Sequence, residues 1–341
     1  MNLGMTTVPK DSAADVTRQD VCVIIVNYGT ADLALEAAAS VLARADRVHS
    51  LHIVDNASPG PDAARMAEAI ASRGWGDRVT LHPERVNHGF GRGNNLVIAA
   101  LLNGPRPPDK VFLLNPDATL GNDAVTLLAD FLDAHPKVGV AGARIEKPGG
   151  MSVTAAFRFP SLISTFSDAI AFGPVSRLFA RWQVPLPATL PSGPVDWVSG
   201  AAVMFRTAAL HDAQMFDPEY FLYYEEVDLM RQTARAGWQT WHVAEALVLH
   251  AEGAATGVKS GRPERRRLPP YWYHSWQYYM HKNHGRATAL LACLLWATGA
   301  TLNHGLSRLR GKQPAAPLGL FGDLSAFALR PLLGLKSGPN D

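Results

Sequence analysis

The first half of the chain repeats one pattern, in which a short apolar run is followed by a stretch with apolar residues at helical spacing. The apolar runs are rich in β-branched residues, as in strands covered on both faces, and they span 21–27, 49–55, 79–82 and 110–117. The stretches with helical spacing span 32–44, 58–70 and 94–102. Repeated strand–helix units of this length predict an α/β fold with a mostly parallel sheet and helices on both faces.

The second half departs from this rhythm. A loop-rich stretch with many prolines follows about Lys147. Beyond it the pattern predicts a strand, a helix and a strand, within 196–206, 226–236 and 241–250. A Gly/Arg/Pro-rich loop follows Ala251, and an aromatic and apolar helical tail begins at Tyr271. We therefore expect a flexible N-terminus at 1–19, an α/β domain at 20–257 and a helical C-terminal region at 258–341.

Composition agrees with a folded protein. Hydrophobic residues make up 47% of the chain and charged residues 18%, which is typical of a chain with a packed core. The net charge of +2 gives no support to nucleic-acid binding, so we expect no nucleic-acid partner. Cys22 and Cys293 stand in apolar surroundings and are predicted to be buried thiols in a reducing compartment. The polar segment through Gln19 lacks an apolar signal core, and we expect a cytoplasmic protein.

The C-terminal region combines positive charge with aromatic residues. Arg262 and the arginines at 265–267 precede a segment with Trp272, Trp276 and several tyrosines, which is the composition of a membrane-interface belt. The apolar stretch at 287–302 falls short of the ~20 apolar residues of a spanning helix. We expect peripheral contact with the cytoplasmic face of the inner membrane; the alternative is a helix packed on the core.

Polar residues follow the predicted strands at the points where the strands end. They are Asn27, Tyr28, Asp55, Asn56, Asn115, Asp117 and His250. A single acid at a strand end is usually a helix cap, but ligands of open α/β sheets bind beyond the carboxyl ends of the strands. Because several such ends converge on one edge, we expect a ligand site there.

The segment NHGFGRGNN, 87–95, places three glycines in front of a predicted helix. Gly89, Gly91 and Gly93 would permit close approach of the backbone to a phosphate or a sugar, and a helix N-terminus favours negative charge. A dinucleotide-binding fingerprint is excluded, because these glycines follow the third strand rather than the first and an asparagine replaces the third glycine of that motif.

Asn115 and Asp117 stand just past a buried strand. At a spacing of two, both can face one pocket, where oxygen ligands hold a hard divalent cation. His250 would complete a set of nitrogen and oxygen ligands for Mn²⁺ or Mg²⁺. The alternative is a proline turn capped by Asp117 and a structural histidine.

The segment FLYYEEVDLMRQ, 221–232, begins a helix with three acids. Glu225, Glu226 and Asp228 complement the helix dipole, which is the simpler explanation of their position. The aromatic residues before them, Tyr223 and Tyr224 among them, would form an apolar wall that raises the pKa of a carboxylate enough for work as a general base.

These blocks occur together in one family. VIIVNY, VDNAS around Asp55, NHGFGRGNN, LLNPDA, VDWVSGAAVMFR, FLYYEEVDLMRQTARAGW and the strand-end His250 stand in the order seen in inverting family 2 glycosyltransferases of the GT-A fold, which the chain resembles over about 20–255. It is most similar to the rhamnosyltransferase-like branch, which builds bacterial surface polysaccharides. The resemblance implies inverting transfer of a sugar from a nucleotide-diphosphate donor, such as dTDP-rhamnose, to a glycan or lipid-linked saccharide.

The resemblance also implies roles for residues. The donor would be bound by Asn27, Tyr28, Asp55, Asn115 and Asp117, and by Asn87, Gly89, Phe90, Gly91, Asn94 and Asn95 of a loop along the nucleotide-sugar. Asp117 takes the last position of the family's DxD metal motif, Asn115 stands at the first, and His250 is a further ligand of Mg²⁺ or Mn²⁺. Trp197, Gly200 and Asp228 would border the donor sugar and the acceptor. Glu226 stands where the family's base is usually the Asp of a Glu-Asp pair, and Glu225 precedes it.

Three other interpretations stay open. A sugar-phosphate nucleotidyltransferase would use a similar sheet, but VNYGTADLAL after the first strand lacks the lysine that its phosphate loop needs. A catalytically inactive sugar-nucleotide-binding module is disfavoured by the presence of Asp117, Glu226 and His250. A membrane scaffold would explain the tail and leave the core motifs without a role.

Overall fold

The computed structural model describes residues 20–44, 46–251 and 265–338. The expected N-terminal part at 1–19, Arg262 and the expected boundary at 257 lie outside the described residues. The strands are β1 (Val21–Asn27), β2 (Val48–Asp55), β3 (Val79–Pro83), β4 (Lys110–Leu114), β5 (Ala118–Leu120), β6 (Val138–Lys147), β7 (Met151–Val153), β8 (Ala156–Phe157), β9 (Gly193–Val195), β10 (Trp197–Val198), β11 (Ala202–Arg206) and β12 (Gln239–His250). The helices are α1 (Ala31–Leu42), α2 (Asp62–Ser72), α3 (Gly89–Leu102), α4 (Ala124–Ala134), α5 (Leu162–Ile170), α6 (Gly173–Leu178), α7 (Thr207–Asp212), α8 (Glu225–Arg235), α9 (Pro270–His284), α10 (Arg286–Leu309), α11 (Leu320–Leu324) and α12 (Arg330–Leu332), with short helical turns η1 (Ala180–Trp182) and η2 (Ser325–Leu329).

The central sheet has the strand order β3-β2-β1-β4-β11-β6-β12-β5. β1 pairs in parallel with β2 and β4, and β2 pairs in parallel with β3. β11 runs antiparallel between β4 and β6, so the sheet is parallel in its first half and mixed beyond β4. Asn27 pairs with Asp55 in register, and Asp55 with Pro83. These strand ends therefore share one edge of the sheet, as predicted.

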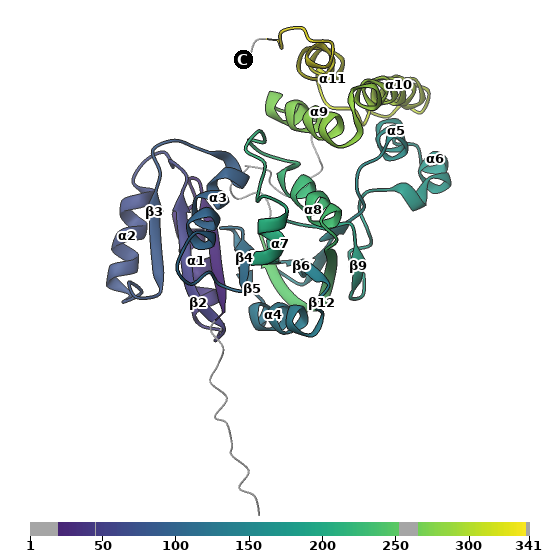
Figure 1. The fold of residues 1–341 in the computed structure, drawn as a ribbon. Coiled ribbons are helices and arrows are strands. Elements are labelled where there is room, and N and C mark those ends of the chain that lie inside the picture. The colour runs from purple at the N-terminus through teal and green to yellow at the C-terminus, as the bar shows by residue number, and fades with distance from the viewer. Residues whose placement is uncertain (1–19, 45, 252–264, 339–341) are drawn as a thin grey trace, which may run out of the picture.

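Helices cover both faces of the sheet (Figure 1). One core packs α1, α2 and α4 on the sheet, with Ala34, Met66 and Leu128 among its buried residues. The other packs α3, α7 and α8 on the opposite face, with Leu210 and Leu229 among its members. Every residue of β1 is buried, because helices lie on both of its sides. That burial explains why its sequence is a continuous apolar run.

The C-terminal helices form a third core together with α5 (Figure 1). Trp272 and Trp276 meet the ring of Trp296 on α10 at centroid distances of 5.3 and 4.9 Å. The prediction that these tryptophans form a membrane-interface belt is therefore wrong, because their rings pack within the protein. α10 lies against α5, where Gly299 gives room to Ala169. At 24 residues α10 is longer than expected, and among the described helices it is the one long and apolar enough to cross a membrane.

Three local predictions need correction. The segment 87–95 is not a loop, because α3 begins at Gly89 and includes all three glycines. The strand predicted over 110–117 ends at Leu114, and a turn separates it from β5. The stretch after Lys147 contains α5, which begins with a reciprocal cap between Ser161 and Ser164. Because prolines surround this helix, the sequence pattern did not predict it. The predicted burial of Cys22 and Cys293 is confirmed.

Candidate active site

The ends of β1 and β2 place Asn27 and Asp55 side by side. The Asn27 amide Nδ2 donates to Asp55 Oδ1 at 3.0 Å and to Ser58 Oγ at 3.1 Å, and Thr30 Oγ1 donates to Asn27 Oδ1 at 2.8 Å. Asn27 and Asp55 are buried, whereas the adjacent Tyr28 is 45% exposed. The edge of the sheet thus carries a carboxylate held by neutral groups, next to an exposed aromatic ring.

Asn56 and Asn87 build the turn that leads into α3. Asn56 Nδ2 donates to Asn87 Oδ1 and to the Gly89 carbonyl, both at 3.0 Å, and Asn56 Oδ1 accepts from the His88 amide at 2.9 Å. Asn87 Oδ1 also accepts from the Gly89 amide at 2.8 Å. Asn87 therefore lies near the end of β2, as expected for a donor-site residue, and its oxygen holds the turn.

The glycines of α3 allow close packing of the helix. Gly89 has a φ of +75°, and a Cβ there would overlap the carbonyl oxygen of Phe221. A Cβ on Gly91 would lie 3.0 Å from Phe216 Cβ, and one on Gly93 would lie 3.1 Å from a valine of β1. Gly91 therefore makes room for Phe216, and its approach to the donor stays a prediction.

Asn94 and Asn95 also bond within the protein. Asn95 Nδ2 donates to the Phe216 carbonyl at 2.7 Å, and its Oδ1 accepts from the Phe216 amide at 3.1 Å. Asn94 is buried and donates to the Phe90 carbonyl at 3.0 Å. Asn95 thus ties α3 to Phe216, whereas the bond of Asn94 stays within α3, and the role of both residues in donor binding stays a prediction.

The ends of β4 and β12 bring Asn115, Asp117 and His250 together. His250 Nε2 lies 2.9 Å from Asp117 Oδ1 and 3.5 Å from Asn115 Nδ2. The side chains of Asp117 and His250 are only 5% and 14% exposed. The Ala251 amide donates to the Asp117 carbonyl at 3.0 Å, which fixes the two strand ends to each other. The sequence prediction that these residues share one place is borne out by this geometry.

This pair fits a divalent cation. A carboxylate and an imidazole at one sheet edge supply oxygen and nitrogen ligands of the kind that Mn²⁺ and Mg²⁺ accept. Within the part of the chain that the structure describes, no group of three or more His, Cys, Asp or Glu side chains could hold a metal. A cation at Asp117 and His250 would therefore need further oxygens, such as those of a bound diphosphate.

α8 begins after a strained turn. Tyr223 and Tyr224 have φ values of +69° and +67°, a left-handed conformation that residues other than glycine adopt rarely and at a cost. α9 holds this turn: the ring of Tyr224 meets that of Trp272 at 5.7 Å, and Ser275 Oγ donates to the Leu222 carbonyl at 2.9 Å. The C-terminal region thus braces the entry to α8.

Glu225 and Glu226 are the first two residues of α8. Burial raises the pKa of the Glu226 carboxyl, and burial together with the charge of Glu226 raises the pKa of Glu225 well above its ordinary value. Among the described residues, none forms a hydrogen bond to Oε2 of either side chain. Glu226 lines a cavity, whereas Glu225 is 3% exposed and does not line it. Glu226 is therefore the carboxyl that a ligand in this cavity can reach.

Gly200 brings Glu226 and Phe90 to one point. A Cβ on Gly200 would lie 3.5 Å from the Phe90 ring and 3.7 Å from Glu226 Cβ. The carbonyl of the next residue, Ala201, accepts a hydrogen bond of 2.9 Å from the Asn115 amide. The beginnings of α3 and α8 and the end of β4 thus adjoin one turn, and the structure gathers these predicted site residues.

Asp228 lies elsewhere. It is 1% exposed, and its carboxylate bonds to Lys282 Nζ at 2.6 Å, to Asn283 Nδ2 at 2.7 Å and to Gln232 Nε2 at 3.0 Å. Two residues along a helix correspond to a rotation of about 200°, so Asp228 faces away from Glu226. Its expected place in the sugar pocket is wrong, and it instead ties α8 to α9.

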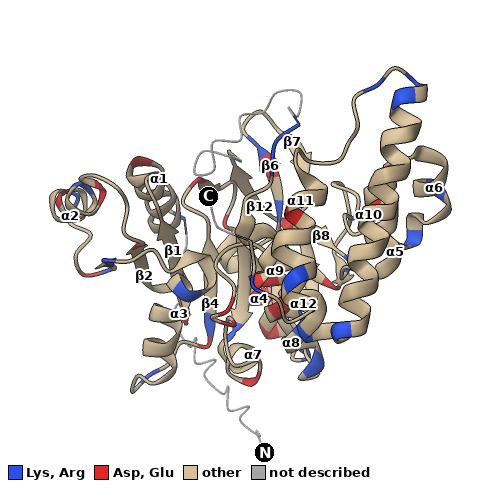
Figure 2. Ribbon diagram, turned by 90° about the horizontal axis from the view of Figure 1, so that it is seen from above, with Lys and Arg blue, Asp and Glu red and all other residues tan. Residues whose placement is uncertain are grey.

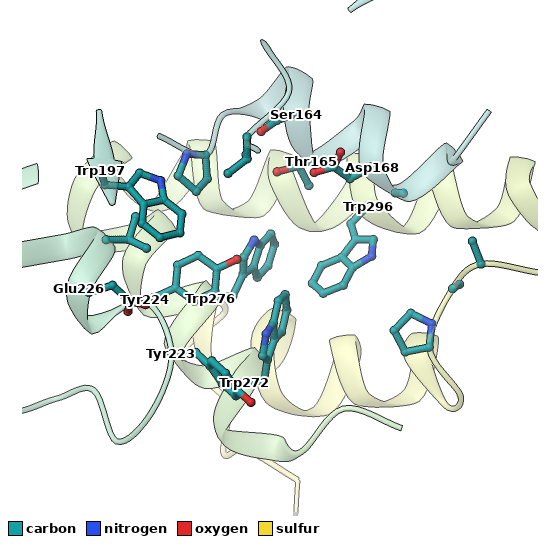
Figure 3. A pocket seen from close by; sticks show the side chains of 17 residues that line it. Ser164, Thr165, Asp168, Trp197, Tyr223, Tyr224, Glu226, Trp272, Trp276 and Trp296 are labelled. Carbon is teal, nitrogen blue, oxygen red and sulfur yellow. The ribbon is translucent and has the colours of Figure 1, made fainter. Parts of the chain in front are cut away.

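A cavity of about 380 Å³ extends from Glu226 between α5, α8, α9 and α10 (Figure 3). Aromatic side chains form much of its wall, namely Trp197, Tyr223, Tyr224, Trp272, Trp276 and Trp296. Trp197 was predicted to border the sugars, and its ring stacks on Phe157 at 4.0 Å. The tryptophans of α9 and α10 and Asp168 of α5 were missed. The spacing of Trp272 and Trp276, one helical turn apart, was the available signal.

Comparison with known proteins identifies a family and two related sequences. The family described as "Glycosyltransferase like family 2" matches residues 18–267. An N-acetylglucosaminyl-diphospho-decaprenol L-rhamnosyltransferase of Mycobacterium tuberculosis is 32% identical over 188 residues, which are 52% of this chain and 61% of that protein. The rhamnosyltransferase WbbL of Escherichia coli is 23% identical over 167 residues, 48% of this chain and 61% of that protein. The chain thus spans under two thirds of each relative's length.

Solved structures share the fold. The mannosyltransferase PcManGT from Pyrobaculum calidifontis, in complex with GDP-Man and Mn²⁺, has a TM-score of 0.52 at 17% identity, over 96% of this chain and 86% of that one. GalNAc-T7 with UDP, GalNAc and Mn²⁺ has a TM-score of 0.54 at 11% identity, over 80% of this chain and 52% of that one. The likeness shows a GT-A fold. With the family match covering more than half of its length, this chain belongs to the family described as "Glycosyltransferase like family 2".

Proposed function

We propose that this chain transfers a sugar, with L-rhamnose the first candidate, from a nucleoside diphosphate to a saccharide linked to a lipid through a diphosphate, with inversion. The names of the two bacterial relatives support the sugar, and that of the mycobacterial relative supports the acceptor. One observation carries the proposal. Glu226 and Phe90 meet at the Gly200 turn, and this turn is hydrogen-bonded to Asn115. Asn115 lies against the Asp117–His250 pair.

The donor nucleotide is assigned to the strand-end edge. Asp55 and Asn27 offer a hydrogen-bonding pair suited to ribose hydroxyls or a base, and the exposed ring of Tyr28 offers a surface for stacking. Phe90, at the beginning of α3, is placed to border the donor sugar beside Gly200. Asp55→Ala should therefore weaken binding of dTDP, measured by calorimetry, without unfolding the chain.

Asp117 and His250 would hold a divalent cation, Mg²⁺ or Mn²⁺. When bound, the cation supplies positive charge that stabilises the departing diphosphate. We expect Asp117→Asn to remove the dependence of dTDP affinity on added Mn²⁺, because one of the two protein ligands is lost. Glu68→Gln, at an exposed position of helix α2, serves as a control for loss of a carboxylate. If the wild-type chain keeps full activity and affinity after thorough chelation, the metal role is wrong.

Glu226 is assigned the role of general base. Its carboxylate takes the proton of the acceptor hydroxyl, the hydroxyl oxygen forms a bond to the anomeric carbon, and the bond from that carbon to the nucleoside diphosphate breaks. Attack comes from the face opposite the leaving group, so a single displacement inverts the anomeric configuration. The raised pKa of Glu226 suits this task, because a base works best when its pKa lies closer to the working pH.

α10 is assigned to the cytoplasmic face of the inner membrane. Leu291, Leu294, Leu302 and Leu309 are 45%, 59%, 46% and 87% exposed, at helical spacing. Lys and Arg occur only near the ends of this helix (Figure 2), so its exposed middle presents apolar side chains that a membrane interface can bury. Replacing Leu291 and Leu294 with Asp should abolish co-sedimentation with phosphatidylglycerol vesicles. Equal sedimentation of wild type and variant would refute this surface.

The experiment that tests the whole proposal is a transfer assay. The full chain is incubated with dTDP-L-rhamnose, a UDP-sugar or a GDP-sugar, each with an N-acetylglucosaminyl-diphospho-alkyl acceptor of short chain and with Mg²⁺ or Mn²⁺. We expect a product heavier by one deoxyhexose with the first donor. Donor binding without transfer or hydrolysis for any pair would favour the alternative, an inactive sugar-nucleotide-binding module.

A further inference from the structure

The cavity beside Glu226 differs in chemistry from the strand-end edge. Its described lining contains two carboxyl side chains, Glu226 and Asp168, and neither Lys nor Arg. None of the strand-end residues assigned to the nucleotide is part of this lining. A nucleoside diphosphate would meet like charge here without a compensating cation. The cavity is therefore suited to an uncharged ligand.

The walls of the cavity suit the faces of sugar rings. Trp272, Trp276 and Trp296 pack edge to face around its interior, so their rings are held in fixed orientations (Figure 3). The C–H face of a pyranose is apolar and packs on an indole face, while its hydroxyls need a few well-placed polar partners. A volume of about 380 Å³ lies in the range of small-ligand sites.

Asp168 supplies such a polar partner at the end of the cavity opposite Glu226 (Figure 3). It lies on α5, one turn after Thr165, whose hydroxyl is bonded to the Ser161 carbonyl at 2.9 Å. Among the described residues, none makes a hydrogen bond or ion pair with the Asp168 carboxyl. The side chain is exposed, although partial desolvation raises the pKa of its carboxyl. An accessible carboxylate in the cavity lining, without a partner among the described residues, is available to accept a hydrogen bond from a ligand.

We propose that this cavity is the acceptor subsite and that Asp168 selects the acceptor. The sugar that carries the attacking hydroxyl lies between the indoles with that hydroxyl at Glu226, and Asp168 accepts a hydrogen bond from a second N–H or O–H group of the acceptor. The diphosphate of the acceptor stays outside, because the lining carries no cation. This inference rests on the proposed function and adds to it a residue of α5 that touches the acceptor at a point remote from the reaction.

Steady-state kinetics of the full chain test the role of Asp168. With dTDP-L-rhamnose and the N-acetylglucosaminyl-diphospho-alkyl acceptor, Asp168→Ala should raise the acceptor KM about tenfold, as expected for loss of a hydrogen bond to a charged group. The donor KM and the rate of donor hydrolysis without acceptor should not change. Asp168→Asn should recover part of the acceptor affinity, and Glu68→Ala should match the wild type. An unchanged acceptor KM in Asp168→Ala, or an equal rise in both KM values, overturns the assignment.

Tryptophan fluorescence gives a second test that needs no turnover. Titration with octyl N-acetylglucosaminide, which has no phosphate, should quench the emission saturably, and Asp168→Ala should weaken that binding. Trp296→Phe should reduce the quenching, whereas Trp182→Phe, outside the cavity lining, should leave it unchanged. A chain that binds this glycoside but transfers no sugar would contradict the proposed function alone. No quenching by the glycoside, or the same quenching by dTDP, would overturn the acceptor subsite.

Discussion

Replacing Glu226 with glutamine changes the chemistry of the site with little change in its shape. Glutamine has nearly the same volume and keeps an oxygen and a nitrogen in the place of the two carboxylate oxygens. It therefore maintains the packing of Glu226 against the Gly200 turn, where a Cβ on Gly200 would lie 3.7 Å from Glu226 Cβ. The amide cannot accept a proton at neutral pH, so the variant tests proton transfer alone.

The expected loss follows from the role of the residue. General-base catalysis contributes on the order of 10²-fold or more, and a 10²-fold loss corresponds to about 2.7 kcal/mol of transition-state stabilisation. Because Glu226 lies outside the strand-end cluster assigned to the nucleotide, the donor KM should stay near the wild-type value. Burial raises the pKa of Glu226, so the wild-type kcat should fall as pH falls through that raised pKa. Glu226→Gln should lose this dependence together with its rate.

The assay is initial-rate transfer over a range of pH, with Glu225→Gln as the matched control one residue away. Glu225 is buried and does not line the cavity, so its variant should keep most of the turnover. Near-normal turnover in Glu226→Gln with an inactive Glu225→Gln would move the base back by one residue. Normal turnover in both variants would refute general-base catalysis by this helix.

Three further predictions concern stability. Lys282→Met leaves the carboxylate of Asp228 buried without its cation. The free energy of unfolding, measured by denaturant titration, should fall by about 3 kcal/mol, the low end for a broken buried pair, because amide donors remain. Gly89→Ala should lower Tm strongly, since its Cβ would overlap the Phe221 carbonyl oxygen at a positive φ; an unchanged Tm would contradict this packing. The pKa of Glu225 is raised on folding, so the folded state binds more protons than the unfolded state does. The stability of the folded state should therefore fall as pH rises from the ordinary glutamate range through the raised pKa. Glu225→Gln should flatten that dependence in thermal melts.

Much of the fold could be predicted from sequence because the sheet has a distinct pattern. β1 is buried along its whole length and is a continuous apolar run, so its bounds were predicted correctly. The predicted strand ends also indicated which polar residues lie close together, and Asp117 and His250 are an example. α3 was placed too late, because Gly89 to Gly93 suggested a loop. These glycines are needed because the helix packs closely against Phe216 and β1. Such tertiary contacts cannot be predicted from local propensity.

The C-terminal region shows where composition misled. Trp272 and Trp276 in a basic, aromatic segment indicate a membrane interface, yet the same rings form an internal wall once α5 and α10 pack around them. Asp168 gave no signal, because a lone acid on a short helix in a proline-rich stretch is usually solvated. Its position in the cavity depends on the long-range contact between α5 and α10, which no local pattern encodes.

The stereochemistry of the product tests the proposed reaction most directly. The wild-type chain is incubated with dTDP-L-rhamnose and the N-acetylglucosaminyl-diphospho-alkyl acceptor, and the configuration of the new linkage is read from the one-bond C–H coupling at the anomeric carbon. A direct displacement assisted by Glu226 predicts a linkage opposite in configuration to that of the donor, and at most a trace of product with Glu226→Gln. A linkage with the configuration of the donor would contradict the displacement.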